Sequence, residues 1–141
     1  MDSPAFQAYA LASAILALQL FILAFWTGTV RARTKQFVNP EDAILNKGQN
    51  VADEHPDVRR AKAAHANALE NAVPFFIVGA LYLATGGSKL GTQAYCFTFL
   101  AARLLHALFY LAGVQPFRTM SFAIGALSVI GMAVHVIRVV L

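Results

Sequence analysis

The sequence contains few charged residues and a single cysteine. Charged side chains make up 13% of its 141 residues and hydrophobic ones 58%, whereas an ordinary soluble domain is about a quarter charged. This shortage of charge excludes an ordinary soluble domain and favours a membrane protein. Cys96 lies in an apolar run, so the chain can form neither an internal disulfide nor a thiolate metal cluster.

Basic residues are concentrated in one segment rather than spread along the chain. The net charge is +4, and 7 of the 11 basic residues fall between Arg31 and Lys62, interleaved with five acidic ones. A loop beside a membrane explains this pattern better than a nucleic-acid surface, so no nucleic-acid partner is expected. No spacing typical of metal ligands is present, and no metal site is expected.

Long uncharged stretches predict four membrane-spanning helices. Residues 3–30 carry no charge, which exceeds the ~20 residues that a helix needs to cross a bilayer. Because this stretch lacks the basic start and short apolar core of a cleaved signal peptide, we expect it to be retained as the first span. The predicted spans are approximately residues 5–30, 62–85, 92–112 and 117–138, with a polar connection at 31–60.

Prolines and glycines mark the ends and contacts of these helices. Pro56 is placed to open the second helix, because its missing N–H costs nothing in a first turn. Gly86 belongs to a segment that breaks the chain after the second span, and Gly125 suits a close contact between helices. The predicted fold class is all-α: an integral membrane four-helix bundle that forms one domain over residues 1–141. A chain this short favours oligomerisation and sites shared between copies.

Four spans place both termini on one side of the membrane. The basic excess of residues 31–60 places that loop in the cytoplasm by the positive-inside rule. Both termini are then expected on the opposite side, and the opening of any site near the loop is expected to face the cytoplasm.

Polar residues inside the spans gather near the end that carries the loop. Glu70 and Arg103 lie roughly 10–15 Å from that end at 1.5 Å per residue, so they can form a direct ion pair. Arg103, His106 and Tyr110 share one stripe of the third span, and Asn67 shares a face with Glu70. Ionisable groups at membrane depth cost at least ~2.5 kcal/mol each and usually mark function, although an ion pair and an amide can also simply hold helices together.

The start of the fourth helix is the strongest candidate for chemistry. Its free N–H groups and dipole favour an anion, and Arg118 and Thr119 add donors there. A cationic neighbour and a helix N-terminus both lower the pKa of a thiol, so a bound thiol would be held as thiolate. Arg31 ends the first helix on the same side. The alternative for Arg118 is that it extends to lipid phosphate.

Three segments together resemble the family of membrane-associated proteins in eicosanoid and glutathione metabolism (MAPEG). They are VRARTKQFVNPEDA from Val30, AHANALENAVPF from Ala64 and ARLLHALFYLAGVQPFRTMSF from Ala102. The combination of NPEDA, H-x-N-x-x-E-N, R-x-x-H-x-x-x-Y and P-x-R is specific, although no single piece is. The resemblance covers nearly the whole chain from Val30 onward.

The resemblance implies a homotrimer that binds one glutathione, as cosubstrate, in each cleft between neighbouring copies. By position, it implies that Arg118 stabilises the glutathione thiolate and that Thr119 stands where some members have a serine proposed to activate the thiol. Asp42 matches an aspartate proposed to assist isomerisation, with a loop or helix cap as the alternative. The residues implied to hold glutathione or support its site are Arg31, Asn67, Glu70, Arg103, His106, Tyr110 and Arg118.

Several positions depart from the prostaglandin-isomerising members of the family. Ala63 and Ala66 replace arginines on the second helix. Two nearby basic residues are candidates to supply part of that charge, namely Lys62 and Arg60. Phe122 and Ala126 replace a tyrosine and a glutamine, which changes one wall of the pocket.

We therefore expect an enzyme, namely a glutathione transferase that can also act as a glutathione peroxidase. Its second substrates are lipophilic electrophiles or hydroperoxides that arrive from the bilayer. Because the reactive sulfur belongs to the cosubstrate, no reactive protein cysteine is needed. Isomerisation of a prostaglandin endoperoxide is the alternative reaction. Two other classes stay open: a small transporter with Glu70 as its coupling carboxylate, against which Arg103 as a counter-ion argues, and a trimeric scaffold without activity.

Overall fold

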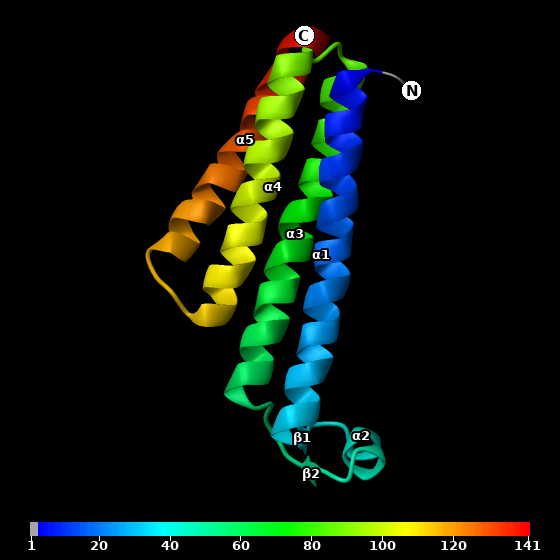
Figure 1. The fold of residues 1–141 in the computed structure, drawn as a ribbon, viewed down its shortest axis with the longest axis vertical. Coiled ribbons are helices and arrows are strands. Elements are labelled where there is room, and N and C mark those ends of the chain that lie inside the picture. Colours follow the sequence, from blue (N-terminus) through cyan, green and yellow to red (C-terminus); the bar gives the residue numbers. More distant parts are fainter. Residues whose placement is uncertain (1–2) are drawn as a thin grey trace.

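Four long helices make up most of the computed structural model, which describes residues 3–141 (Figure 1). They are α1 (Pro4–Thr34), α3 (Pro56–Ala84), α4 (Lys89–Ala112) and α5 (Phe117–Val140). Each is long and apolar enough to cross a membrane, which confirms the prediction of an all-α, multi-pass membrane protein. The beginning of α1 and the end of α5 lie at the same end of the bundle (Figure 1).

Local sequence signals explain where the helices begin and end. Pro56 occupies the first turn of α3, as its position predicts. The Ser88 side chain accepts a hydrogen bond from the Gly91 amide at 3.1 Å, so α4 begins three residues before the predicted start of the third span. Gly113 ends α4 in the left-handed conformation, with φ 71°.

The connection between α1 and α3 has a structure of its own, which the sequence analysis did not anticipate. It contains α2 (Pro40–Leu45) and two short strands, β1 (Gln36–Phe37) and β2 (Gln49–Asn50), which pair in parallel. Phe37 is 5% exposed and anchors the segment. Figure 1 shows this small unit beyond the end of α1 and α3, at the pole opposite the termini.

Each helix contributes to one apolar core. Leu16 of α1, Phe75 of α3, Phe99 of α4 and Met132 of α5 are all at most 2% exposed, and they belong to the same cluster. The rings of Phe75 and Phe99 stack with centroids 4.4 Å apart. Because α3 and α4 each pack on both other long helices and on one another, α1 and α5 occupy opposite corners of the bundle.

Small residues let aromatic side chains fit between the helices. The Tyr9 ring of α1 lies against Gly79 of α3, where an added Cβ would meet ring atoms at 2.8 Å. From this position the Tyr9 hydroxyl donates to the Phe76 carbonyl at 2.7 Å. Gly86 adopts φ 81° in the turn after α3, so it forms part of the expected break between the second and third spans. Gly125 lies beside the Arg103 side chain.

Candidate functional site

Arg103 forms the deepest polar contact between α3 and α4. Its side chain is 2% exposed, and Nη2 donates to Asn67 Oδ1 at 2.6 Å and to the Asn67 carbonyl at 3.3 Å. From α1, Gln19 Nε2 donates to the Arg103 carbonyl at 3.1 Å. Gly125 of α5 leaves room for the stem of Arg103, because an added Cβ would stand 3.4 Å from Cδ. Asn67 thus fixes the guanidinium, Gln19 holds the backbone of Arg103, and Gly125 makes the expected close contact.

The expected ion pair between Glu70 and Arg103 is wrong. Within residues 3–141 no ion pair joins the two side chains, and Glu70 lies on the exposed face of α3. Ala68 and Ala72 face the core of the bundle, and Glu70 lies two positions from each, about 200° away around the helix. Equal depth therefore did not produce contact. The sequence argued against a transporter because Arg103 could neutralise Glu70. Without this ion pair, that objection no longer holds.

The contact with Arg103 determines which Asn67 atoms remain available. Because Asn67 Oδ1 accepts from Arg103, the Asn67 amide presents its NH₂ group as a donor. Arg103 also keeps two buried N–H groups, at Nε and Nη1, without an acceptor among residues 3–141. This part of the site consequently offers several donors, which suit an anionic or carbonyl ligand.

His106 links α4 to the first turn of α5. Its Nδ1 lies 2.9 Å from the Arg118 carbonyl. Since a carbonyl only accepts, Nδ1 carries the proton, and Nε2 of a neutral ring is an acceptor. Ser121 also donates to the Arg118 carbonyl, at 3.0 Å. Two donors thus hold the backbone from which the Arg118 side chain projects.

Gln115 holds the two residues predicted to carry the chemistry. When its amide oxygen faces Arg118, that oxygen accepts from Nε at 3.1 Å and from Nη2 at 2.6 Å, while its NH₂ group donates to Thr119 Oγ1 at 3.0 Å. This orientation is assigned because it satisfies all three groups. The Arg118 guanidinium also lies 4.7 Å above the centre of the Tyr110 ring. The sequence analysis missed Gln115, although it stands three and four positions before Arg118 and Thr119.

The first turn of α5 offers fewer free amides than its position in the sequence suggested. The Arg118 amide donates to the Val114 carbonyl at 3.3 Å, and the Met120 amide to the Pro116 carbonyl at 3.1 Å. An anion here is therefore attracted mainly by the half-exposed Arg118 side chain and the exposed Thr119 hydroxyl.

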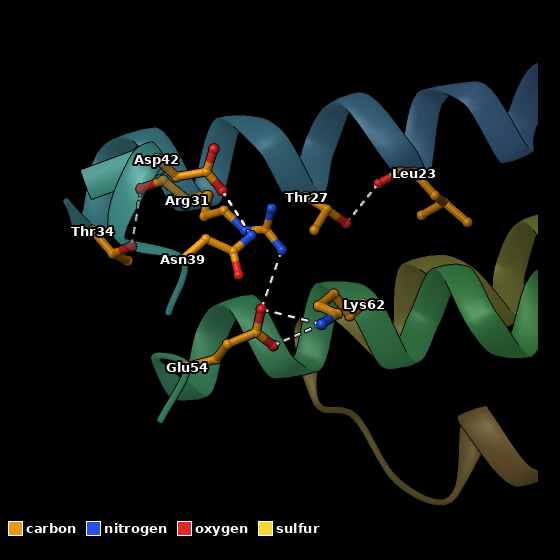
Figure 2. A network of polar contacts seen from close by, with 8 residues as sticks. All are labelled: Leu23, Thr27, Arg31, Thr34, Asn39, Asp42, Glu54 and Lys62. Carbon is orange, nitrogen blue, oxygen red and sulfur yellow. Dashed lines mark hydrogen bonds and ion pairs between the residues drawn. The ribbon is translucent and has the colours of Figure 1, made fainter. Parts of the chain in front are cut away.

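Arg31 lies in a separate network at the loop end of α1 and α3 (Figure 2). Arg31 Nη2 donates to Glu54 Oε1 at 3.1 Å, and Lys62 Nζ donates to the two carboxylate oxygens at 3.1 and 3.0 Å. Burial raises the pKa of Glu54, but the hydrogen bonds and charges of Lys62 and Arg31 outweigh it, so this pKa lies below its ordinary value. Glu54 thereby ties α1 to α3, and Lys62 is engaged here.

The same network borders a polar cavity of about 400 Å³ under the α2 segment. Asp42 lines it, and the Asp42 carboxylate accepts a hydrogen bond from Asn39 Nδ2 at 3.1 Å at the start of α2. This contact joins two side chains of the connection, and the role expected of Asp42 stays a prediction. The cavity also places Asp42 and Arg31 together, as Figure 2 shows from close by.

The fold of a single chain therefore brings together some of the predicted residues and separates others. It joins His106, Tyr110, Arg118 and Thr119 into one cluster, which we call the Arg118 cluster. No hydrogen bond or ion pair among residues 3–141 connects Arg31 or Glu70 to that cluster.

Cys96 and two further histidines take part in core packing or helix capping. Cys96 is 0% exposed within the core, which agrees with its inert environment in the sequence. His55 caps α3, where its Nδ1 accepts from the Asp57 amide at 3.2 Å. The His135 ring packs 4.6 Å from that of Tyr82.

Comparison with known proteins agrees with this architecture. The model of the MAPEG family matches residues 9–138. Prostaglandin E synthase of Homo sapiens is 33% identical over 138 residues, which cover 97% of this chain and 91% of that protein. Microsomal glutathione S-transferase 1 of Homo sapiens is 32% identical over 145 residues, which cover 98% and 92%. The chain belongs to the MAPEG family.

Proposed function

We propose that the protein is a membrane glutathione transferase that attacks lipophilic electrophiles or reduces lipophilic hydroperoxides. The observation that carries this proposal is the Arg118 cluster, in which a half-exposed guanidinium and an exposed hydroxyl are held side by side by Gln115. The similarity to a microsomal glutathione S-transferase supports glutathione as the thiol.

The Arg118 cluster suits a thiolate because it offers positive charge and a free proton donor. A nearby cation lowers the pKa of a thiol and so stabilises the nucleophilic form. Since Gln115 donates to Thr119 Oγ1, the hydroxyl hydrogen of Thr119 remains available to donate to sulfur. Tyr110 and His106 keep Arg118 in position. Arg118 and Thr119 are thus the proposed catalytic residues.

The donors near Asn67 suit the carboxylates of glutathione. The Asn67 NH₂ group is free to bind a carboxylate, and Arg103 acts through Asn67 as a positioning residue. Glu70 and Arg31 complete the site from a neighbouring copy in a homotrimer. The exposed position of Glu70 supports this assembly, because a carboxylate facing lipid at this depth costs at least ~2.5 kcal/mol.

The loop end of the bundle faces the cytoplasm in this proposal. Seven basic residues lie between positions 31 and 62, and the positive-inside rule assigns such a segment to the cytoplasmic side. Glutathione then enters from the cytoplasm, while the second substrate and lipids reach the cleft from the bilayer.

Isomerisation of a prostaglandin endoperoxide is a second candidate reaction. The 33% identity with a prostaglandin E synthase favours it. Phe122, which is 40% exposed, stands with its ring centroid 6.0 Å from that of His106, so an apolar side chain borders the cluster at this wall. Conversion of an endoperoxide to its E-type ketone by the purified protein would establish this reaction.

Ultraviolet absorbance of the purified protein mixed with glutathione tests the main proposal. The wild type is expected to develop the thiolate band, and Arg118→Ala to keep much of the binding while losing the band and most of the turnover. Arg138→Ala, which removes an exposed arginine at the other end of α5, is the matched control. Absence of glutathione binding, or unchanged turnover in Arg118→Ala, would refute the proposal.

A further inference from the structure

A groove has an apolar part between α1 and α4 and a cationic part between α1 and the start of α3. The apolar part encloses about 470 Å³ and is lined almost entirely by aliphatic side chains, including Ile22, Leu104 and Leu108. The second part encloses about 260 Å³ beside Arg33 and Arg60. Leu111 lines both parts, so they join into one groove.

The residues that α1 contributes to the groove follow one face of this helix. Ile15, Ile22, Trp26 and Arg33 of α1 are spaced seven, four and seven residues apart, so they follow one face of the helix. The stripe extends for about 27 Å at 1.5 Å per residue. This length exceeds one leaflet of a bilayer, which is half of a hydrocarbon core of about 30 Å. An acyl chain can therefore lie along the groove at its natural depth.

Two arginines are held at the mouth of the groove. The Arg33 guanidinium lies 5.7 Å from the centre of the Trp26 ring. The Arg60 side chain of α3 reaches the C-terminus of α4, where an added Cβ on Gly113 would stand 2.9 Å from Nη1. The dipole of α4 favours a cation there. The single carboxylate that lines this part is Asp57. The mouth consequently keeps a net positive charge.

We propose that the groove binds an anionic phospholipid of the surrounding leaflet, with one acyl chain between α1 and α4 and the phosphate between Arg33 and Arg60. Guanidinium groups match the oxygens of a phosphate in charge and geometry. Basic pockets beside membrane helices select anionic headgroups, and Trp26 lies at the boundary between the apolar and cationic parts, where aromatic residues favour the membrane interface. The site is separate from the Arg118 cluster and independent of the proposed catalysis.

Native mass spectrometry of the full chain in detergent tests this proposal. The delipidated protein is mixed in turn with phosphatidylglycerol and phosphatidylcholine of identical acyl chains, and with oleate. We expect retention of phosphatidylglycerol at least about tenfold above phosphatidylcholine, a difference of about 1.4 kcal/mol. The Arg33→Gln/Arg60→Gln double variant should lose this preference, and Leu108→Trp should reduce binding by filling the apolar part.

Matched controls separate the groove from general surface effects. Arg138→Gln removes an exposed arginine at the opposite end of the bundle. Leu127→Trp alters a leucine of similar exposure, 65% against 62% for Leu108, in an apolar hollow that no arginine lines. Both should bind phosphatidylglycerol as the wild type does, and thermal melting identifies any variant that fails to fold.

Three outcomes would overturn the proposal. Equal retention of both phospholipids, or undiminished preference in the double variant, would remove the role of the arginines. Binding of oleate without phosphatidylglycerol would assign the groove to a fatty acid. A disulfide between copies of an Ile22→Cys variant in native membranes would show that a second copy covers the groove.

Discussion

Three side chains hold the charged residues of this region in place through hydrogen bonds. Gln115 holds Arg118 and Thr119, Asn67 holds Arg103, and Glu54 joins Arg31 to Lys62. In each case the partner fixes which atoms remain free to meet a ligand. Substitution of the partner therefore tests the site without removing the charge itself.

Replacement of Gln115 tests its positioning role. Gln115→Leu removes both acceptor contacts to Arg118 and the donor to Thr119, and a hydrogen bond to a charged group contributes about 1.5–3 kcal/mol. Because Arg118 is half-exposed, we expect the lower end, a loss of about tenfold in turnover, and a higher pKa for the bound thiol, followed by absorbance against pH. Gln93→Leu, at the far end of α4, should change neither quantity. An unaltered thiol pKa in Gln115→Leu would exclude the positioning role.

Replacement of Asn67 tests the contact that holds Arg103. Asn67→Leu leaves the buried guanidinium without its side-chain acceptor, which costs about 1–3 kcal/mol of stability. Thermal unfolding in detergent should show the loss. Gln93→Leu provides the comparison, because the half-exposed Gln93 side chain makes no hydrogen bond within residues 3–141, and it should leave the unfolding nearly unchanged. Equal effects of the two variants would contradict this assignment.

The charge on Glu54 should stabilise the loop end only above a limiting pH. The pKa of the Glu54 carboxyl is lower in the folded protein than its ordinary value of 4.5. The ionised carboxylate therefore stabilises the folded protein at pH values above 4.5. This stabilisation is lost as the pH falls below 4.5 and passes through the pKa of the folded state. Hydrogen exchange in residues 36–50 should be severalfold faster in Glu54→Gln than in the wild type at pH 7. The difference between the two proteins should shrink as the pH falls below 4.5, and a difference that did not change with pH would show another cause.

At the scale of the helices, small residues set how closely neighbouring elements approach. Gly79 admits the Tyr9 ring between α1 and α3, Gly131 admits Tyr95 between α4 and α5, and Gly125 admits the Arg103 stem. The polar site depends on this packing, because Asn67, Arg103 and Arg118 come from three different helices. A shift of one helix would therefore disturb contacts far from the substituted residue.

Two glycine substitutions on different helices distinguish packing from helix propensity. Gly79→Ala places a Cβ 2.8 Å from the Tyr9 ring, and such overpacking costs about 1–3 kcal/mol. Gly28→Ala adds a Cβ with no atom within 4 Å and should leave stability unchanged or raised. Thermal unfolding of both variants checks this expectation, and a stable Gly79→Ala would contradict the close packing of α1 on α3.

At the scale of the whole molecule, the polar residues are distributed unevenly along the bundle. The α2 segment and the turn between α4 and α5 lie toward one end, and the α3–α4 turn lies with the termini at the other (Figure 1). The Glu54 network adjoins the α2 segment, and the Arg118 cluster adjoins the turn before α5. This polarity gives the protein two distinct ends in a membrane. It also leaves Glu70 on an outer face, where the proposed trimer would cover it.

Cysteine labelling can determine the orientation of the two ends. Cys96 is 0% exposed, so the wild type should react little with a membrane-impermeant maleimide. Lys47→Cys, in the connection between α1 and α3, should label from the cytoplasmic side, and Ser88→Cys, in the α3–α4 turn, only from the opposite side. Labelling of both positions from one side would refute the proposed topology.

Composition and local patterns were sufficient to predict the helices and the types of residue in the site. Uncharged stretches predicted four apolar helices, Pro56 its helix start, and the spacing of Arg103, His106 and Tyr110 a common stripe, because these properties depend on neighbours along the chain. The motifs also pointed to the family that the comparisons confirm.

Only the tertiary structure decided which polar groups meet. Depth along a helix follows from the sequence, but contact between helices also depends on rotation, which packing of apolar faces determines. Glu70 and Arg103 share a depth yet face different directions, and Arg103 binds Asn67 instead. In the same way, the fold of the loop determined that Glu54 engages Arg31 and Lys62, and the turn before α5 that Gln115 engages Arg118.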